Sequence, residues 1–475
     1  MSAWLSTGGL WMLLALGGLV LTTGLPLWSL LIGVASAFSV LGWVVGAMDV
    51  AVLASAPQRL VGLLENDLLQ ALPLYVFMGI LLQKLPVGAA LYATLSRLFG
   101  RVRAGDVLAA LGVGALIAPM NGSVAASASL LSNMLRPRVE KMQPAHAITL
   151  VGLAATIGVV VPPSLVLVLL GDAMMRAHTE ASHLGGSALH VVRIINTRDV
   201  LNAAALPALL LLLAWSVVAV WCNRAVRFER VSVTGRQMAM AALSAVGIVA
   251  LLGMVFVGWV MPVEAAATGC VLLVLITAIS RALSGPQWAE LLHETLVLSG
   301  ALMALLVGAT IFSLVFRLWG TDQWLSDLLL AATWPPRVMA LCVLVFVALC
   351  AWVLDAFEMI FVLLPIVAPP LIVMLGDAQQ VAVLLLLVLQ LSFLLPPLGY
   401  ALVMARAGLH LHVSLRQLFL ATAPFLLLQT LALALVFVFP AGVHTLDADV
   451  TASPQLGDEA IEAQMRAMSE GDAAP

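Results

Sequence analysis

A proline pair in VVVPPS, residues 159–164, interrupts a long apolar stretch, and a second pair in FLLPPLG, residues 393–399, lies 234 residues further on. Proline removes a backbone donor and clashes with the preceding turn, so each pair is predicted to break a helix. Within a membrane, the backbone groups freed by a break survive only where protein buries them or where they line a cavity. The two pairs therefore predict a polar centre shared by two parts of the chain.

The composition around these breaks is that of a membrane protein. Of 475 residues, 63% are hydrophobic and 9% are charged, whereas roughly a quarter are charged in an average soluble protein. The mean hydropathy is +1.12, and a soluble globular protein is excluded. A β-barrel would show short alternating segments, but runs such as 206–220 are continuously apolar. The predicted class is an all-α polytopic membrane protein.

Apolar runs between charged breaks predict the spanning segments. They lie near residues 3–24, 27–47, 62–83, 145–171, 200–222, 237–258, 261–280, 290–316, 378–405 and 416–440. Two further apolar stretches, 106–135 and 338–375, are each interrupted midway by polar or helix-breaking residues. Two half-length helices that meet at a polar tip fit this pattern better than one crossing, so each stretch is predicted to be a re-entrant hairpin.

The tips and the proline pairs form an internal repeat with a single offset. Asn121 lies 41 residues before Pro162, and Asp355 lies 41 residues before Pro396. We therefore predict a first repeat at 1–223, a second at 224–440, and an acidic, solvated external tail at 441–475. The register fails after Pro163, which places about 16 extra residues in an external segment near 172–197.

Lysine and arginine concentrate on one side of the predicted threading, which holds 14 of the 21. Cytoplasmic loops are enriched in these residues, so that side is predicted to be cytoplasmic and both chain termini periplasmic. The hairpin at 106–135 then enters from the cytoplasm and the hairpin at 338–375 enters from outside. The predicted fold is thus built from inverted repeats with two re-entrant helical hairpins.

Polar and helix-breaking residues gather at the two tips and the two breaks. Such interruptions at matching positions of inverted repeats mark the binding sites of secondary transporters, where freed carbonyls coordinate sodium ions. We therefore predict a sodium-binding, cavity-lining site. Its first-repeat residues are Asn121, Gly122, Ser123, Ser127, Thr156, Gly158, Pro162, Pro163 and Ser164, and its second-repeat residues are Asp355, Ala356, Glu358, Gln390, Ser392, Pro396, Pro397 and Gly399.

Each of these residues also has a plainer structural interpretation. Serine and glycine in apolar helices usually serve packing, a proline pair can be a simple kink, and Asp355 or Glu358 can face water near the outer surface. Two kinks at one repeat offset favour a site over chance. An acidic residue within an apolar stretch is costly to bury and is functional by default.

Other chemistries find little support. The histidines at 178, 183 and 190 and at 410 and 412 have no further ligand type beside them, so solvated loops are favoured over a metal centre. HExxH, GxSxG and P-loop motifs are absent, which excludes ATP hydrolysis and leaves no enzyme motif. No basic stripe suits nucleic acid. Sodium is the expected coupling ion, and no other cofactor is expected.

Five stretches resemble the large, DctM-like membrane subunit of tripartite ATP-independent periplasmic (TRAP) transporters. They are LPLYVFMGILLQ (72–83), ATIGVVVPPS (155–164), MPVEAAATG (261–269), LDAFEMIFVLLPI (354–366) and LQLSFLLPPLGYAL (389–402). The resemblance implies a sodium-driven elevator transporter in the bacterial inner membrane, working with a periplasmic substrate-binding protein and a separate small four-helix membrane subunit. Family members commonly have Thr where Leu395 stands and Asn where Val388 stands, so the second cation site has lost oxygen ligands.

We therefore expect sodium-coupled uptake of a small organic anion, a carboxylate, across the lipid bilayer. One alternative is a stand-alone anion symporter of a related fold that needs no periplasmic partner. A second alternative is a membrane-embedded enzyme or scaffold that uses Asp355 and Glu358 as acid–base groups. Neighbouring genes for a binding protein and a small four-helix protein would support the first interpretation alone.

Overall fold

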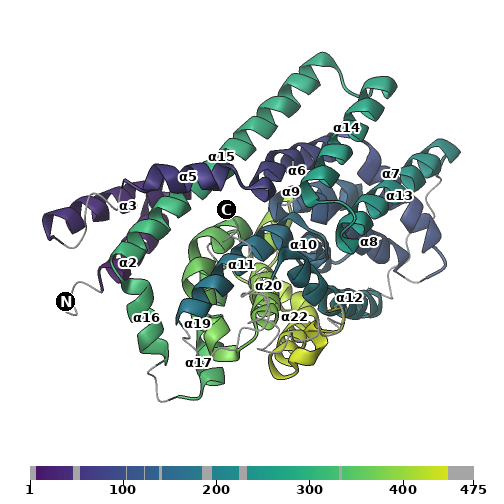
Figure 1. Ribbon diagram of the computed structural model, residues 1–475. Coiled ribbons are helices and arrows are strands. Elements are labelled where there is room, and N and C mark those ends of the chain that lie inside the picture. The colour runs from purple at the N-terminus through teal and green to yellow at the C-terminus, as the bar shows by residue number, and fades with distance from the viewer. Residues whose placement is uncertain are drawn as a thin grey trace, which may run out of the picture.

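The computed structural model describes residues 7–46, 54–102, 104–121, 123–137, 142–184, 195–223, 233–330, 334–352 and 354–447. All regular structure within these ranges is helical, with no β-strand (Figure 1). Seven helical segments in the described part of the chain are long and apolar enough to cross a membrane, or up to nine if each bent pair counts as one span. The predicted all-α polytopic class is confirmed.

The first half of the chain contains ten described helices. They are α2 (Gly8–Thr23), α3 (Leu27–Val44), α5 (Ala56–Leu64), α6 (Asp67–Lys84), α7 (Val87–Leu98), α8 (Gly105–Asn121), α9 (Val124–Leu135), α10 (Pro144–Val160), α11 (Leu165–Leu184) and α12 (Thr197–Cys222).

The second half follows the same order. Its helices are α13 (Gly235–Val257), α14 (Pro262–Ser280), α15 (Gly285–Leu318), α16 (Thr321–Leu330), α17 (Pro336–Cys350), α18 (Ala356–Glu358), the π-helix η3 (Met359–Leu363), α19 (Leu364–Leu375), α20 (Ala378–Leu394), α21 (Tyr400–Leu409), α22 (Leu415–Val438) and the short 3₁₀-helix η4 (Pro440–Val443). The long helix α15 corresponds to α5 and α6 together, and α16 corresponds to α7.

The helices divide into two groups by burial and by their neighbours. An inner bundle comprises α8–α12 and α17–α22, and within it α10 and α20 are buried along nearly their whole length. An outer frame comprises α2, α3, α5, α6 and α13–α15, in which α15 packs on α3 and α6, and α14 packs on α6. Frame side chains such as Trp259 and Ile279 are exposed, as expected for surfaces that face lipid. Figure 1 shows α15 running along one side of the molecule, with α10, α11 and α20 near its middle.

Both interrupted stretches are pairs of helices. Helices α8 and α9 occupy 106–135, and α17 is followed by α18, η3 and α19 within 338–375. The segment Ala356–Leu375 alone is apolar enough to cross a membrane, but 67% of its best window is buried inside the protein. Burial by protein rather than by lipid suits the returning limb of a hairpin.

The structure differs from the predicted spans in three respects. The predicted single spans 145–171 and 378–405 are each two helices, and α10 and α11 are bent by 43° at their break. Helices α7 and α16 were not among the predicted elements. The predicted tail is described only as far as residue 447, and residues 448–475 lie outside the described part of the chain.

The predicted external segment 172–197 is wrong for its first half, because residues 172–184 continue α11. Asp172 and Arg176 are an i, i+4 ion pair, so these charges support the helix instead of ending it. Ala177 and Ala181 of the same turns are buried. Residues 185–194 lie outside the described residues.

A polar clip fastens the chain after α22 to the inner bundle. His444 Nε2 lies 2.8 Å from Asp377 Oδ2, and His444 Nδ1 lies 3.0 Å from Asp447 Oδ2. Asp377 also caps α20, because its Oδ1 accepts the Gln380 N–H at 3.0 Å. Burial lowers the pKa of His444, but hydrogen bonds to both carboxylates and their charges raise it further, so the net pKa is above its usual value.

The clip predicts a pH-dependent attachment. Because the folded-state pKa is raised, its contribution is fully present below the unfolded value of about 6.5 and is lost as pH rises through the folded pKa. Amide hydrogen exchange at residues 440–447, corrected for intrinsic rates, should be slower at pH 6 than at pH 9. His444→Gln should remove this difference. Equal protection at both pH values in the unmodified protein would contradict the assignment.

Candidate functional site

The two proline breaks lie at equivalent places in the inner bundle. Helix α10 ends at Val160 and α11 begins at Leu165, while α20 ends at Leu394 and α21 begins at Tyr400. The Pro162–Pro163 and Pro396–Pro397 peptide bonds are both cis. The four prolines thus interrupt helices whose other residues are buried, so the breaks expose backbone carbonyls deep inside the protein.

A chain of buried amide groups joins the two repeats beside these breaks. Gln390 Nε2 donates to the Thr156 carbonyl oxygen at 3.3 Å, and these two residues are themselves related by the offset of 234. Gln429 of α22 donates from Nε2 to Gln390 Oε1 at 2.9 Å and to the Leu387 carbonyl oxygen at 3.1 Å. Thr156, Gln390 and Gln429 are all at most 1% exposed. Equivalent residues of the two repeats therefore meet at the centre of the bundle.

The first hairpin packs directly against the first broken helix. A Cβ atom at Gly158 would lie 2.4 Å from the carbonyl carbon of Ala118 in α8, and one at Gly114 would lie 2.4 Å from the Ala154 carbonyl oxygen. Such separations are well inside van der Waals contact, so glycine lets the two backbones approach. Gly158 thus serves close packing, which is the plainer of its two predicted roles.

The tip of the first hairpin is only partly described. Ser123 caps α9, because its Oγ accepts the Ala126 N–H at 3.4 Å, and Ser127 one turn later is 2% exposed. Asn121 is the last residue of α8, but its side chain and Gly122 lie outside the described part of the structure. The hydroxyl oxygens of Ser123 and Ser127 therefore stand at the start of the returning limb.

Ser164 organises the exit from the first break. Its Oγ donates to the Val159 carbonyl oxygen at 3.2 Å and accepts the Leu167 N–H at 3.1 Å. The hydroxyl thereby satisfies one carbonyl freed by the break and one amide at the start of α11. Ser164 is 1% exposed, so this bridging role stabilises the broken geometry.

The acidic tip of the second hairpin is a capping box. The Asp355 N–H donates to Glu358 Oε2 at 2.9 Å, and the Asp355 side chain accepts the N–H of Glu358 in return. Both acids are partly buried, and the adjacent Ala356 is 1% exposed. The two carboxylates therefore begin the returning limb, as Ser123 does in the first repeat. The π-helix that follows is a helical form often found at functional sites.

A hydroxyl in the second repeat replaces the glycine contact of the first. Ser392 is equivalent to Gly158, and its Oγ donates to the Val388 carbonyl at 2.9 Å and lies 3.0 Å from the Ala348 carbonyl of α17. Gly399 is needed for space, since a Cβ there would lie 2.8 Å from the Phe393 carbonyl oxygen. Each broken helix therefore contacts the entering limb of the hairpin in its own repeat.

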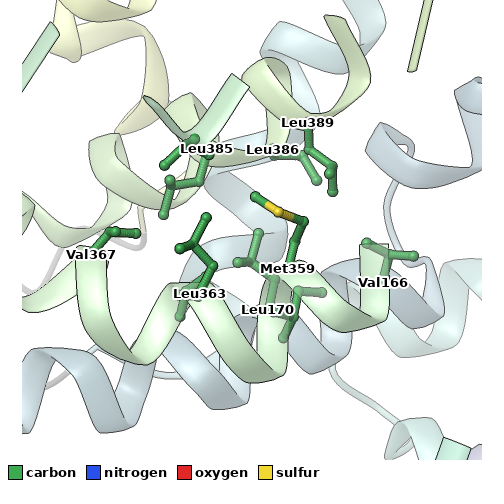
Figure 2. A pocket seen from close by; sticks show the side chains of 11 residues that line it. Val166, Leu170, Met359, Leu363, Val367, Leu385, Leu386 and Leu389 are labelled. Carbon is green, nitrogen blue, oxygen red and sulfur yellow. The ribbon is translucent and has the colours of Figure 1, made fainter. Parts of the chain in front are cut away.

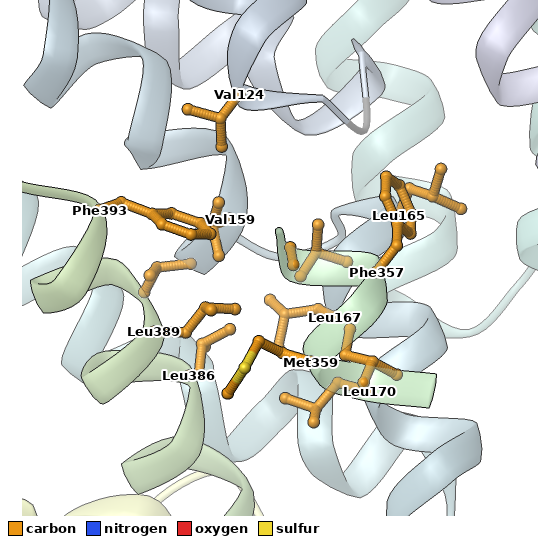
Figure 3. Packing of buried hydrophobic residues seen from close by; sticks show 14 of the residues in the cluster. Val124, Val159, Leu165, Leu167, Leu170, Phe357, Met359, Leu386, Leu389 and Phe393 are labelled. Atoms are coloured by element: carbon orange, nitrogen blue, oxygen red, sulfur yellow. The ribbon is translucent and has the colours of Figure 1, made fainter. Parts of the chain in front are cut away.

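Apolar side chains fill the space between the hairpins and the breaks. Figure 3 shows Val124 of the first hairpin and Phe357 and Met359 of the second on either side of Val159 and Phe393. A small cavity of about 20 Å³ lies beside them, lined by apolar side chains that include Met359 and Leu389 (Figure 2). It is too small and too apolar to hold an organic anion.

The oxygen atoms gathered here suit a hard monovalent cation better than a transition metal. No group of three His, Cys, Asp or Glu side chains that could hold a metal ion occurs among the described residues. Break carbonyls at 161–164 and 395–399, with hydroxyls such as Thr156 and Ser392, are instead the kind of ligand that binds sodium in transporters. Sequence analysis missed Gln429, although a lone amide in the apolar run 416–440 was visible.

Comparisons with known proteins agree with this arrangement. Residues 13–442 match the family described as "Tripartite ATP-independent periplasmic transporter, DctM component". The chain is 26% identical over 434 residues to the sialic acid TRAP transporter large permease protein SiaM of Vibrio cholerae, covering 89% of this chain and 94% of SiaM. The crystal structure of the Alcanivorax borkumensis YdaH transporter is similar in fold, with a TM-score of 0.57 and 16% identity, over 83% of this chain and 90% of YdaH.

The family match spans nearly the whole chain and includes both hairpins and both breaks. Its members are transport permeases, so the alternative of a membrane-embedded enzyme is set aside. This chain belongs to the DctM family, the large membrane subunits of tripartite ATP-independent periplasmic transporters.

Proposed function

We propose that this chain is the permease subunit for sodium-coupled uptake of a small organic anion across the bacterial inner membrane. It would work with a periplasmic substrate-binding protein and a small four-helix membrane subunit, as its family implies. The observation that carries the proposal is the Gln390–Thr156 contact, which joins two equivalent helix breaks and places two sets of freed carbonyls around one centre.

The division into inner bundle and outer frame supports an elevator mechanism. The inner bundle holds both hairpins and both breaks, while α15 of the frame packs on α3 and α6. A body that carries its own cation ligands can move past such a frame without dismantling the site. Coupling then follows if sodium binding is needed to draw the hairpin tips against the breaks before the bundle moves.

The two halves of the site are unequal. Val388 and Leu395 are apolar, and the Val388 carbonyl already accepts the hydroxyl proton of Ser392. The second repeat thus offers fewer side-chain oxygens than the first, apart from the acids of its capping box. We infer that the first repeat, with Ser123, Ser127 and Thr156, supplies the better cation site.

The proposed substrate class is a carboxylate. The name of SiaM assigns it sialic acid, and at 26% identity we carry over only the acidic group. A stand-alone symporter of related fold remains the second candidate, because YdaH is similar in fold at 16% identity. The two candidates differ in whether a binding protein is required.

Reconstitution tests the proposal directly. Proteoliposomes that contain this chain and the small subunit should accumulate a carboxylate only with an inward sodium gradient and the loaded binding protein outside. A potassium gradient of equal size should give no accumulation. Full-rate uptake without the binding protein would overturn the tripartite scheme and favour the stand-alone symporter.

A variant at the first tip tests the cation site. Asn121→Leu places an apolar side chain where a ligand oxygen is proposed, and should abolish sodium-driven uptake while the protein elutes as a folded, monodisperse species. Asn133→Leu is the matched control, since Asn133 is an exposed residue of α9 in the same hairpin. Unchanged sodium dependence in Asn121→Leu would remove the tip from the site.

A further inference from the structure

A cavity of about 520 Å³ lies between the outer frame and the inner bundle. Three arginines from distant parts of the chain line it: Arg59 of α5, Arg176 of α11 and Arg317 of α15. We propose that this cavity is a vestibule that accepts the carboxylate of the substrate on its way to the helix breaks. The inference rests on the proposed function for the identity of the anion, but its electrostatic basis can be tested separately.

The charges in the cavity leave one cation in excess. Arg176 is paired with Asp172, and Arg317 is paired with Glu180. Arg59 makes no hydrogen bond or ion pair with another residue in the described ranges, so three guanidinium groups face two carboxylates. Each guanidinium carries five donors, so one carboxylate partner does not saturate Arg176 or Arg317.

The remaining walls suit the body of a small organic acid. Hydroxyl groups come from Thr179 of α11 and from Thr310 and Ser313 of α15, and an apolar wall comes from Ile360 and Phe361 of the π-helix. Sites for small molecules commonly enclose about 300–1,000 Å³ and combine apolar walls with a few polar groups. This cavity has that size and that mixture, unlike the apolar cavity of about 20 Å³ that Ile360 also lines.

Contacts around the cavity connect the frame to the bundle. Arg317 belongs to α15 of the frame, and Glu180 belongs to α11 of the bundle. Asn66, which precedes α6 of the frame, donates from Nδ2 to Asp172 Oδ1 of α11 at 3.2 Å. A carboxylate bound to Arg317 would compete with Glu180 for the same guanidinium. The proposed ligand thus touches both groups of helices that an elevator must move apart.

Charge-selective labelling tests the vestibule without knowledge of the natural substrate. Cys222, Cys270, Cys342 and Cys350 are first replaced by alanine, and Ser313→Cys then places a single thiol in the cavity. Its rates with anionic sulfonatoethyl and cationic trimethylammonioethyl methanethiosulfonate are compared with those of a small free thiol. The anionic reagent should be favoured at position 313 relative to the free thiol.

The arginine variants give the decisive comparison. Arg59→Gln and Arg317→Gln should each lower the anionic preference by about 3-fold, the effect expected of one charge several ångströms away in a wet cavity. Arg59→Lys should keep it, and Arg281→Gln, at the exposed end of α14, should not change it. No anionic preference, or an equal one in the arginine and control variants, would overturn the proposal.

Protection completes the test. Lactate, benzoate and N-acetylneuraminate are each added before the reagent at equal ionic strength, with uncharged mannitol as the control. At least one carboxylate should slow labelling of the Ser313→Cys thiol in a manner that Arg59→Gln weakens. Protection by none of the acids, or equal protection by mannitol, would refute carboxylate binding. Uptake is not measured, so a failure of sodium coupling would leave this outcome unchanged.

Discussion

Backbone polar groups freed inside a membrane must find partners within the protein. The two proline breaks create such groups at equivalent places, and much of the inner bundle can be understood as a response to them. Ser164 satisfies a carbonyl and an amide at the first break. Gln390 reaches the Thr156 carbonyl across the repeats. Helices α10 and α20 are buried along nearly their whole length, so lipid is kept away from both breaks.

The repeats meet this constraint with different residues. In the first repeat, Gly158 brings the backbone of α10 against α8. At the equivalent place in the second, Ser392 turns a hydroxyl toward α17. The returning limbs differ in the same way, since a serine caps one and an acidic capping box begins the other. One architecture therefore holds two chemically different half-sites, which is why we assign them unequal roles in cation binding.

The sequence predicted the parts of this structure that local chemistry determines. Proline pairs and polar tips stand out in apolar stretches, and one repeat offset was enough to relate them. The continuation of α11 was missed because Asp172 and Arg176 resemble a loop in sequence but form an i, i+4 pair in the helix. Gln429 and the cavity arginines were missed for a different reason: they come together only through tertiary packing, and no spacing along the chain relates residues 59, 176 and 317.

The central claim is that the two breaks and the two tips form a sodium site, and equilibrium binding tests it most directly. A ligand that binds only the folded state raises stability with the logarithm of its concentration. The Tm of the purified chain in nanodiscs should rise steadily with sodium at constant ionic strength, stay flat with potassium, and lose its sodium dependence in Asn121→Leu. An equal Tm in sodium and potassium across the whole range would contradict the account.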